Sequence, residues 1–276
     1  MRGKVLSVLG ATVLAVALPQ LAAPLASADS YTYANPTAIL PPDGGPSGEA
    51  SLIAVAGATG KVSDVNVRLV GVEHPDPDEL DVALTGPGGQ TVVLVSDACG
   101  NPDIADLTFT IDDEATGPFP LSDCTTGSFR PTNVDNGTDP FVTTPTGTTL
   151  AVFDGADPNG LWTLHVYDAG PAGESATIAG GFALDIQTTD VTSPDTTLTK
   201  KPKSSTKTRA KIKFTATEAG ARFECKVDKK AFKPCTSPLK LKGLKVGKHK
   251  VQVRAVDAAG NVDPTPAKLK WRVKPG

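Results

Sequence analysis

Imidazole, the usual general base of hydrolytic enzymes, occurs only three times in this chain, at His74, His165 and His249. A Ser-His-Asp triad needs a nucleophile beside such a base and a third group that orients the base. His165 lies within an alternating apolar run and is expected to be structural, while His74 ends a run and is expected to pack or to cap a turn. The sequence contains neither G-x-S-x-G nor H-E-x-x-H. It therefore predicts a chain that is not an enzyme.

Clustered carboxylates are the second group of side chains that could perform chemistry, here as metal ligands. Calcium takes six to eight oxygen ligands, often from one loop together with backbone carbonyls. No cluster has the spacing of an EF-hand loop, and the alternative is a solvated acidic surface whose Asp residues serve turns. Calcium is the one cofactor that the pattern suggests, and the candidate ligands fall in two loops: Asp76, Asp78, Glu79 and Asp81 in one, and Asp154, Asp157 and Asn159 in the other.

Cationic side chains are concentrated in the last third of the chain. Residues 29–194 carry 24 acidic and three basic side chains, whereas residues 195–276 carry 22 basic and six acidic ones. The basic segment could bind an anionic polymer, such as cell-wall teichoic acid or extracellular nucleic acid, through counterion release, or could simply be a solvated lysine-rich surface. Few aromatic residues are interleaved with the lysines, so recognition of nucleic-acid bases is not expected. The candidate polyanion-binding residues are Lys200, Lys201, Lys203, Lys207, Arg209, Lys240, Lys242 and Lys245.

The N-terminus has the organisation of a secretory signal peptide. Arg2 and Lys4 precede an apolar run from residue 5 to 18, and Ala26-Ser27-Ala28 offers a small-x-small cleavage pattern. The apolar run is too short to span about 30 Å of hydrocarbon as a helix. We therefore expect residues 1–28 to be removed and the remaining chain to be secreted, without a membrane span.

Four cysteines in an exported chain favour two disulfides, and four allow three connectivities. We favour Cys99 with Cys124 and Cys225 with Cys235, because each pair lies within one predicted domain. A zinc site made by all four thiolates is the alternative. It would require side chains from two domains to converge without a C-x-x-C pair.

Short runs of alternating polarity, separated by Gly, Pro, Asp and Asn, predict an all-β fold. No segment after the signal peptide repeats apolar residues at helical spacing over three turns. Gly86-Pro87-Gly88-Gly89 predicts a hairpin turn. The acidic half is expected to form strands at 52–55, 65–69, 80–84, 91–95, 107–111, 148–153, 161–167 and 178–186, and the basic half at 212–214, 223–227, 251–255 and 269–273.

The change in charge and a turn-rich segment mark the domain boundaries. We expect a signal peptide at 1–28, a first domain at 29–188, a linker at 189–194 and a second domain at 195–276. About 80 residues suit an immunoglobulin-like sandwich in the second domain.

Five stretches of the acidic half, which follow one another between residues 74 and 186, form a recognisable pattern: HPDPDELDVALTGPGGQTVVLVSDACG, LTFTIDDEA, FRPTN, LAVFDGADPNGLWTLHVYDAG and IAGGFALDI. By these stretches the acidic half resembles the P domain, also called Homo B, that follows the catalytic domain of kexin- and subtilisin-like serine proteases. Phe182 departs from the pattern, since many relatives have Trp there. The resemblance implies a jelly-roll-like β-sandwich and strengthens the calcium hypothesis.

The basic half carries a second set of motifs: DTTLTKKP, FTATEAGARFECKVD, FKPCTSPLKLKGL and VRAVDAAGNVDPTPA. By these motifs it is similar to a bacterial immunoglobulin-like repeat that usually acts as a spacer. Together the resemblances imply a secreted, non-catalytic binding or accessory protein whose partner is an extracellular protein or an anionic wall polymer. The alternative is an accessory of a separate subtilisin-like endopeptidase acting in trans.

Overall fold

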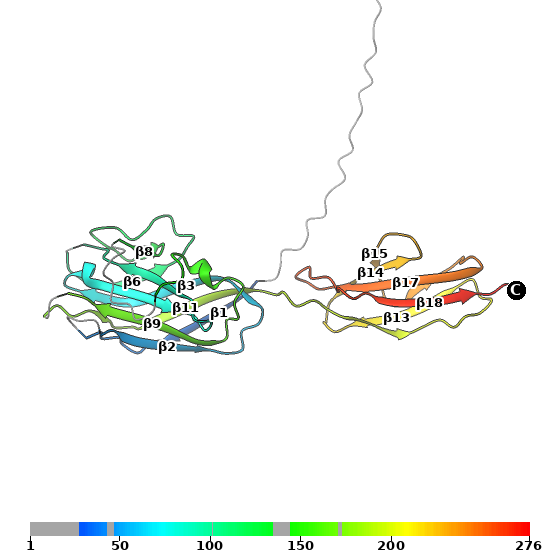
Figure 1. Ribbon diagram of the computed structural model, residues 1–276, viewed down its shortest axis with the longest axis horizontal. Helices are drawn as coiled ribbons and strands as arrows, with labels where there is room; N and C mark the ends of the chain where they lie inside the picture. The colour runs from blue at the N-terminus through cyan, green and yellow to red at the C-terminus, as the bar shows by residue number, and fades with distance from the viewer. Residues whose placement is uncertain (1–27, 43–46, 101, 135–143, 171–172) are drawn as a thin grey trace, which may run out of the picture.

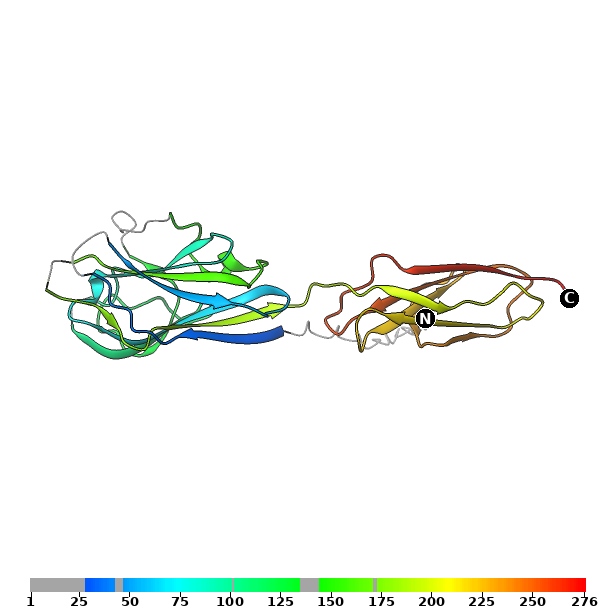
Figure 2. The same cartoon turned by 90° about the horizontal axis from the view of Figure 1, so that it is seen from below.

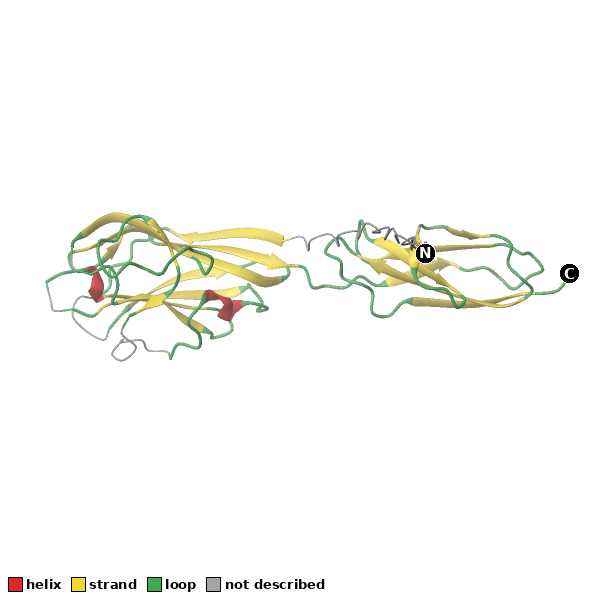
Figure 3. Ribbon diagram, turned by 90° about the horizontal axis from the view of Figure 1, so that it is seen from above, coloured by secondary structure: helices red, strands yellow, loops and turns green. Residues whose placement is uncertain are grey.

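The computed structural model describes residues 28–42, 47–100, 102–134, 144–170 and 173–276, and confirms the expected all-β fold. The predicted signal peptide lies outside the described residues except for Ala28. Within these residues the helices are two single-turn 3-10 segments, η1 (Pro77–Glu79) and η2 (Leu150–Phe153), shown in red in Figure 3. None of the described helices has the length and apolar character needed to cross a membrane.

The eighteen strands found in the described residues form two bodies that follow one another along the chain and are joined by an extended segment (Figures 1 and 2). The first body is a sandwich of two sheets. Most pairs in it are antiparallel, but β5–β8 and β6–β7 are parallel. One sheet has the order β1 (Ala28–Asn35), β11 (Phe182–Thr189), β3 (Lys61–His74), β6 (Ile104–Ile111) and β7 (Gly127–Phe129), with β10 (Thr177–Ile178) on β3, and the other has the order β2 (Glu49–Val55), β9 (Gly160–Asp168), β4 (Leu80–Thr85), β5 (Thr91–Ser96) and β8 (Thr132–Asn133).

Alternation along the strands places the core of the first body between its sheets. Val65, Val67 and Leu69 of β3 are at most 1% exposed, whereas Asn66 and Arg68 between them are half-buried. The β4–β5 hairpin closes as predicted, with the Gly86 N–H donating to the Gln90 carbonyl at 2.9 Å. Because successive strand residues point to opposite faces, the alternation of apolar and polar residues in β3 places one face of the strand in the core.

Several elements of the first body differ from the sequence-based expectation, and the short strands β7 and β8 were not predicted. Strand β1 was not predicted, although all eight of its residues pair with β11. The predicted strand at 148–153 is instead the helix η2, whose Leu150 and Phe153 are buried three positions apart. The carboxylate of Asp113 accepts the N–H groups of Leu150 and Ala151 at 2.9 and 2.8 Å, which supports the helical turn. The predicted strand at 178–186 is divided between β10 and β11.

The second body contains two smaller sheets around a separate cluster of buried side chains, which includes Ile212, Phe214, Val251, Val253 and Trp271. Both predicted disulfides are present. Cys99–Cys124 lies in the first body and Cys225–Cys235 joins two neighbouring strands of the second. The sheets of the second body are β12 (Thr196–Lys200), β13 (Ala210–Ala216) and β16 (Leu239–Leu241), and β15 (Lys233–Cys235), β14 (Arg222–Val227), β17 (Gly247–Val256) and β18 (Ala267–Val273).

Candidate metal centre

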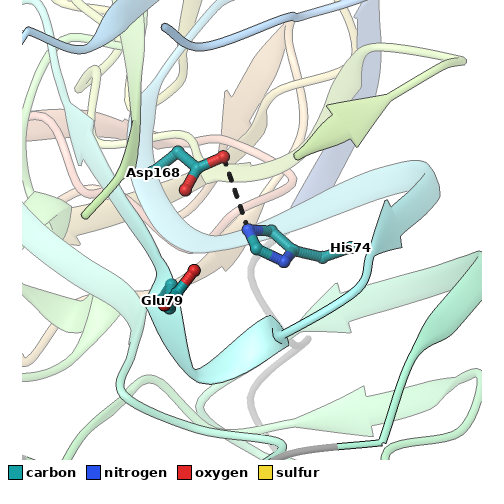
Figure 4. Close-up of side chains that lie close together, drawn as sticks. All are labelled: His74, Glu79 and Asp168. Carbon is teal, nitrogen blue, oxygen red and sulfur yellow. Dashed lines mark ion pairs between the residues drawn. The ribbon is translucent and has the colours of Figure 1, made fainter. Parts of the chain in front are cut away.

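An acidic pocket forms where the end of β3 meets the ends of β4 and β9. His74 is the last residue of β3, and Pro75 and Pro77 then turn the chain into η1. Proline fixes φ near the value that a first helical turn requires, so the turn begins at Pro77. On the other side, Asp168 ends β9 directly opposite Leu80, the first residue of β4. This pairing brings His74, Glu79 and Asp168 together (Figure 4).

The hydrogen bonds of His74 define which of its ring nitrogens carries the proton. Its Nδ1 accepts the backbone N–H of Asp76 at 2.9 Å. A nitrogen that accepts a hydrogen bond cannot also carry a proton, so the neutral ring carries its proton on Nε2. That nitrogen faces the Asp168 Oδ2 at 3.5 Å (Figure 4). His74 is therefore a buried ring whose Nδ1 acts as an acceptor and whose Nε2 faces Asp168.

Asp168 is a fully buried carboxylate without a cationic partner. Its Oδ2 accepts the N–H of Ala176 at 2.8 Å, while its Oδ1 has no hydrogen-bond donor. Transfer of an ionised carboxylate out of water is costly unless a charge or several donors compensate it. Among the described residues, no lysine or arginine lies within ion-pair distance of this carboxylate. Its Oδ1 is therefore a buried oxygen that a bound cation could satisfy.

Glu79 is a second carboxylate whose negative charge is not compensated, and several acidic side chains surround it. Burial and the charges of Asp76, Glu174, Asp168 and Asp78 raise the pKa of Glu79 to about 7. Its Oε2 is buried without a hydrogen-bond donor. Such a shift means that the ionised form is disfavoured until something positive enters the pocket.

The pocket offers two overlapping sets of ligand atoms, each within 4.8 Å of one another. One is His74, Glu79 and Asp168, and the other is Asp76, Glu79 and Glu174. Transition metals bind the deprotonated nitrogen of an imidazole whose other nitrogen donates a hydrogen bond. His74 has the opposite arrangement, so the available ligands are carboxylate oxygens. Oxygen ligands are those that calcium prefers. Hereafter the acidic pocket means His74, Asp76, Glu79, Asp168 and Glu174.

The sequence-predicted calcium residues have three different environments. Asp76 and Glu79 lie in the acidic pocket, and a hydrogen bond with Asp76, burial and the charge of Asp76 raise the pKa of the adjacent Asp78. Asp81 is buried on β4, where its Oδ1 accepts the Ser96 hydroxyl at 2.6 Å. The pocket residues missing from the prediction are His74, Asp168 and Glu174.

The second predicted calcium loop forms a turn. Asp157 accepts both the backbone and the side-chain N–H of Asn159, and Asn159 in turn bonds the backbone N–H and carbonyl of Ala58. Asp154 follows η2, and burial and the charge of Asp113 raise its pKa. Over the described residues, these side chains join no group of three acidic or imidazole ligands.

A third acidic group, not predicted from the sequence, lies where the two bodies join. Asp190, Glu218 and Asp257 each place an oxygen within 4.8 Å of the others. Both oxygens of Asp257 already accept N–H groups of Asn261, at 2.7 and 2.9 Å. Both oxygens of Asp257 therefore have a donor, whereas the Oδ1 of Asp168 has none.

The predicted polyanion-binding residues are spread over the second body. Lys200 lies on β12 opposite Lys213, and Lys240 lies on β16 opposite Lys211. The remaining six are exposed in connecting segments: Lys201, Lys203, Lys207, Arg209, Lys242 and Lys245.

The other two histidines have no serine partner among the described contacts. His249 directs Nδ1 to Asp228 at 3.0 Å and Nε2 to the Lys245 carbonyl at 2.8 Å. His165 is half-buried on β9, and burial lowers its pKa.

No protein-family model matches the sequence, and no curated protein matches it either. Solved structures show distant similarity. The complex of the Aeromonas sobria serine protease with a chaperone aligns at 14% identity and a TM-score of 0.35, over 61% of this chain and 28% of that one. The fibronectin(III)-like modules of Clostridium thermocellum CbhA align at 16% identity and a TM-score of 0.27, over 90% of this chain and 95% of that one. Scores this low assign neither a family nor an activity, and the resemblance to the P domain stays a prediction.

Proposed function

We propose that this chain is an exported, non-catalytic binding protein whose first β-sandwich holds calcium in the acidic pocket. The uncompensated carboxylate of Asp168 carries the proposal. It is completely buried, and it lies beside Glu79, whose pKa is raised to about 7 by burial and by its acidic neighbours. A divalent cation would satisfy both groups at once.

The choice of calcium rests on the donor atoms. The carboxylates of Asp76, Glu79, Asp168 and Glu174 surround the pocket, and His74 presents a proton rather than a lone pair. A hard cation that accepts six to eight oxygens at flexible geometry suits this set, with water and backbone carbonyls completing the shell. Calcium would hold the end of β3 to the end of β9, so its role here is structural.

The non-catalytic assignment is supported by the histidines. In a triad one ring nitrogen faces a carboxylate and the other faces the nucleophile. His74 faces Asp168 with one nitrogen, but the other accepts a backbone amide, and the ring is fully buried. We expect no labelling of the purified protein by a serine-directed fluorophosphonate. Labelling together with peptide cleavage would refute this part of the proposal.

Thermal unfolding tests the calcium site directly. A ligand at 100 times its dissociation constant stabilises the folded state by about 2.7 kcal/mol. For a domain of this size, we therefore expect 1 mM calcium to raise the melting temperature by about 5–10 °C over that in chelator. Magnesium is the control cation, because it demands a tighter octahedral shell and should stabilise less. Equal melting temperatures with calcium and with chelator would remove the proposal.

Two isosteric variants separate metal binding from folding. Asp168→Asn and Glu79→Gln each remove one negative charge while keeping an oxygen. Both should lose most of the calcium-induced shift, yet unfold no earlier than the wild type in chelator, since a repulsion is removed as well. Glu73→Gln is the matched control, because Glu73 precedes His74 on β3 but is exposed. A calcium response equally weak in all three variants would contradict the assignment of this pocket.

The partner of the protein is a separate question. The alternative, an accessory of a serine endopeptidase acting in trans, predicts that the protein captures such an enzyme from culture supernatant. Recovery of an active serine protease would favour that alternative within the same non-catalytic role.

A further inference from the structure

Two adjacent strands of the second body place like charges directly opposite one another. In the antiparallel pair β17–β18, Lys248 faces Arg272 and Lys250 faces Lys270. The alternate residues Val251 and Trp271 are buried, so the four cations share the outer face of the sheet. Opposed side chains in such pairs have Cβ atoms about 4.5–5.5 Å apart, and like charges at that distance are destabilising.

The carboxylates on this face are already engaged. Glu224 contacts Arg254 at 2.7 Å. Asp228 accepts the backbone N–H of Lys250 with one oxygen at 2.9 Å and contacts His249 with the other at 3.0 Å. The four cations of β17 and β18 therefore keep an excess of positive charge that the protein does not neutralise. The repulsion between these cations lowers the stability of the folded state. A single acidic substitution would relieve it.

A hollow lies at the same position. Its volume is about 670 Å³, and five cationic residues line it together with Asp228, Ser204, His249 and Trp271. Lys248, Lys250, Lys270 and Arg272 are joined there by Lys229. Cationic groups at successive outward positions of one strand lie about 7 Å apart. The hollow thus presents a two-by-two array of cations to a linear anion.

We propose that the β17–β18 face binds a polymer of phosphodiester-linked polyol units, with one phosphate near each cation. Lysine and arginine both bind phosphate, the first as a point charge and the second as a planar fork. Among the described residues of this face, no well-exposed aromatic ring is available for nucleic-acid bases to stack on. Trp271 is only 7% exposed, and the ring of Phe232 is covered by the Arg254 guanidinium at 4.2 Å. The observations therefore favour a backbone without bases over a single-stranded nucleic acid.

Binding of poly(glycerol phosphate) to the full chain tests this proposal. The quadruple variant Lys248→Gln, Lys250→Gln, Lys270→Gln and Arg272→Gln should bind at least 10-fold more weakly. Its plot of log K against log salt should be shallower by about 3, because each phosphate contact on a flexible chain contributes about 0.7 to the slope. Chelator should change neither result, so failure here is distinguishable from failure of the calcium site.

The opposite sheet supplies a control with the same change in charge. Lys200 faces Lys213 and Lys211 faces Lys240 on that sheet, so four Gln substitutions there also remove four positive charges. They also test the sequence-based expectation that Lys200 and Lys240 bind a polyanion, which the assignment of the β17–β18 face replaces. This control should weaken binding by less than 3-fold. Equal losses in the two quadruple variants would overturn the proposal in favour of net charge alone. Tighter binding of single-stranded DNA than of poly(glycerol phosphate) would also overturn it.

A single reversal of charge gives a second readout that misfolding cannot imitate. Lys270→Glu places a carboxylate opposite Lys250 and converts a repulsive pair into an attractive one. We expect the melting temperature of this variant to rise while its affinity for the polymer falls at least 5-fold. An unchanged affinity, or a lower melting temperature, would contradict the proposal.

Discussion

The Nδ1 of His74 accepts the backbone N–H of Asp76, two residues along the chain, at 2.9 Å. This bond gives the loop after β3 its shape and at the same time determines the chemistry of the ring. His249 shows the contrast, because both of its nitrogens face acceptors, Asp228 and the Lys245 carbonyl. The Nδ1 of His74 is thereby committed as an acceptor, whereas the contacts of His249 favour its charged form.

The tautomer of His74 is a direct prediction of this arrangement. Nitrogen-15 correlation spectra should show the proton on Nε2, both in chelator and in calcium, because calcium takes the surrounding oxygens instead. Zinc is the comparison cation, because it readily binds an imidazole nitrogen whereas calcium prefers oxygen ligands. A shift of the proton to Nδ1 on addition of calcium would mean that Nε2 ligates the metal, contrary to the oxygen-only site.

The raised pKa of Glu79 predicts how stability depends on pH without calcium. The folded-state pKa is about 7 against an ordinary value of 4.5, so the folded protein binds the proton more tightly between these values. The contribution of this group to the free energy of unfolding must therefore fall as pH rises from about 4.5 to 7. In chelator, Glu79→Gln should match the wild type near pH 4 and exceed its stability at pH 8. Urea unfolding at a series of pH values measures this, and a constant difference would exclude the effect.

The acidic pocket shows how far sequence reasoning extends toward a site. Asp76 and Glu79 were predicted because they are close in sequence. Asp168 was not, because it lies almost 90 residues further on and reaches the pocket only through the pairing of β9 with β4. His74 was expected to cap a turn, and it does so, but its second contact depends on the same long-range pairing.

The fold shows a similar division between local and long-range information. Strand alternation was sufficient for β3, where a buried side chain follows every half-buried one from Val65 to Leu69. It misled at 148–153, because the alternating apolar residues there form a 3-10 turn whose N–H groups bind Asp113, distant in sequence. Strand β1 carries weak alternation and depends on β11 for its pairing, so only the tertiary structure reveals it.

Gly170 should be required for the acidic pocket. A Cβ at this position would collide with the carboxylate of Glu79, so Gly170→Ala must displace that side chain. Changes in groups that orient metal ligands commonly cost 10- to 100-fold in affinity, and we expect at least 10-fold weaker calcium binding by calorimetry. Gly117→Ala is the control, because a Cβ there meets no atom within 4 Å. Equal affinities of the two variants would show that Glu79 is not a ligand.

The pKa values of His249 and His165 should be shifted in opposite directions. The Lys245 carbonyl and the Asp228 carboxylate raise the pKa of His249 above 6.5, whereas burial lowers the pKa of His165 below it. The stabilisation from charged His249 is complete below pH 6.5 and is lost as pH rises through its folded-state pKa. Proton NMR of the two rings over pH 5–9 measures both values in one sample. Asp228→Asn should bring the pKa of His249 down while leaving that of His165 unchanged, and a His249 pKa at or below 6.5 in the wild type would contradict the contacts that surround it.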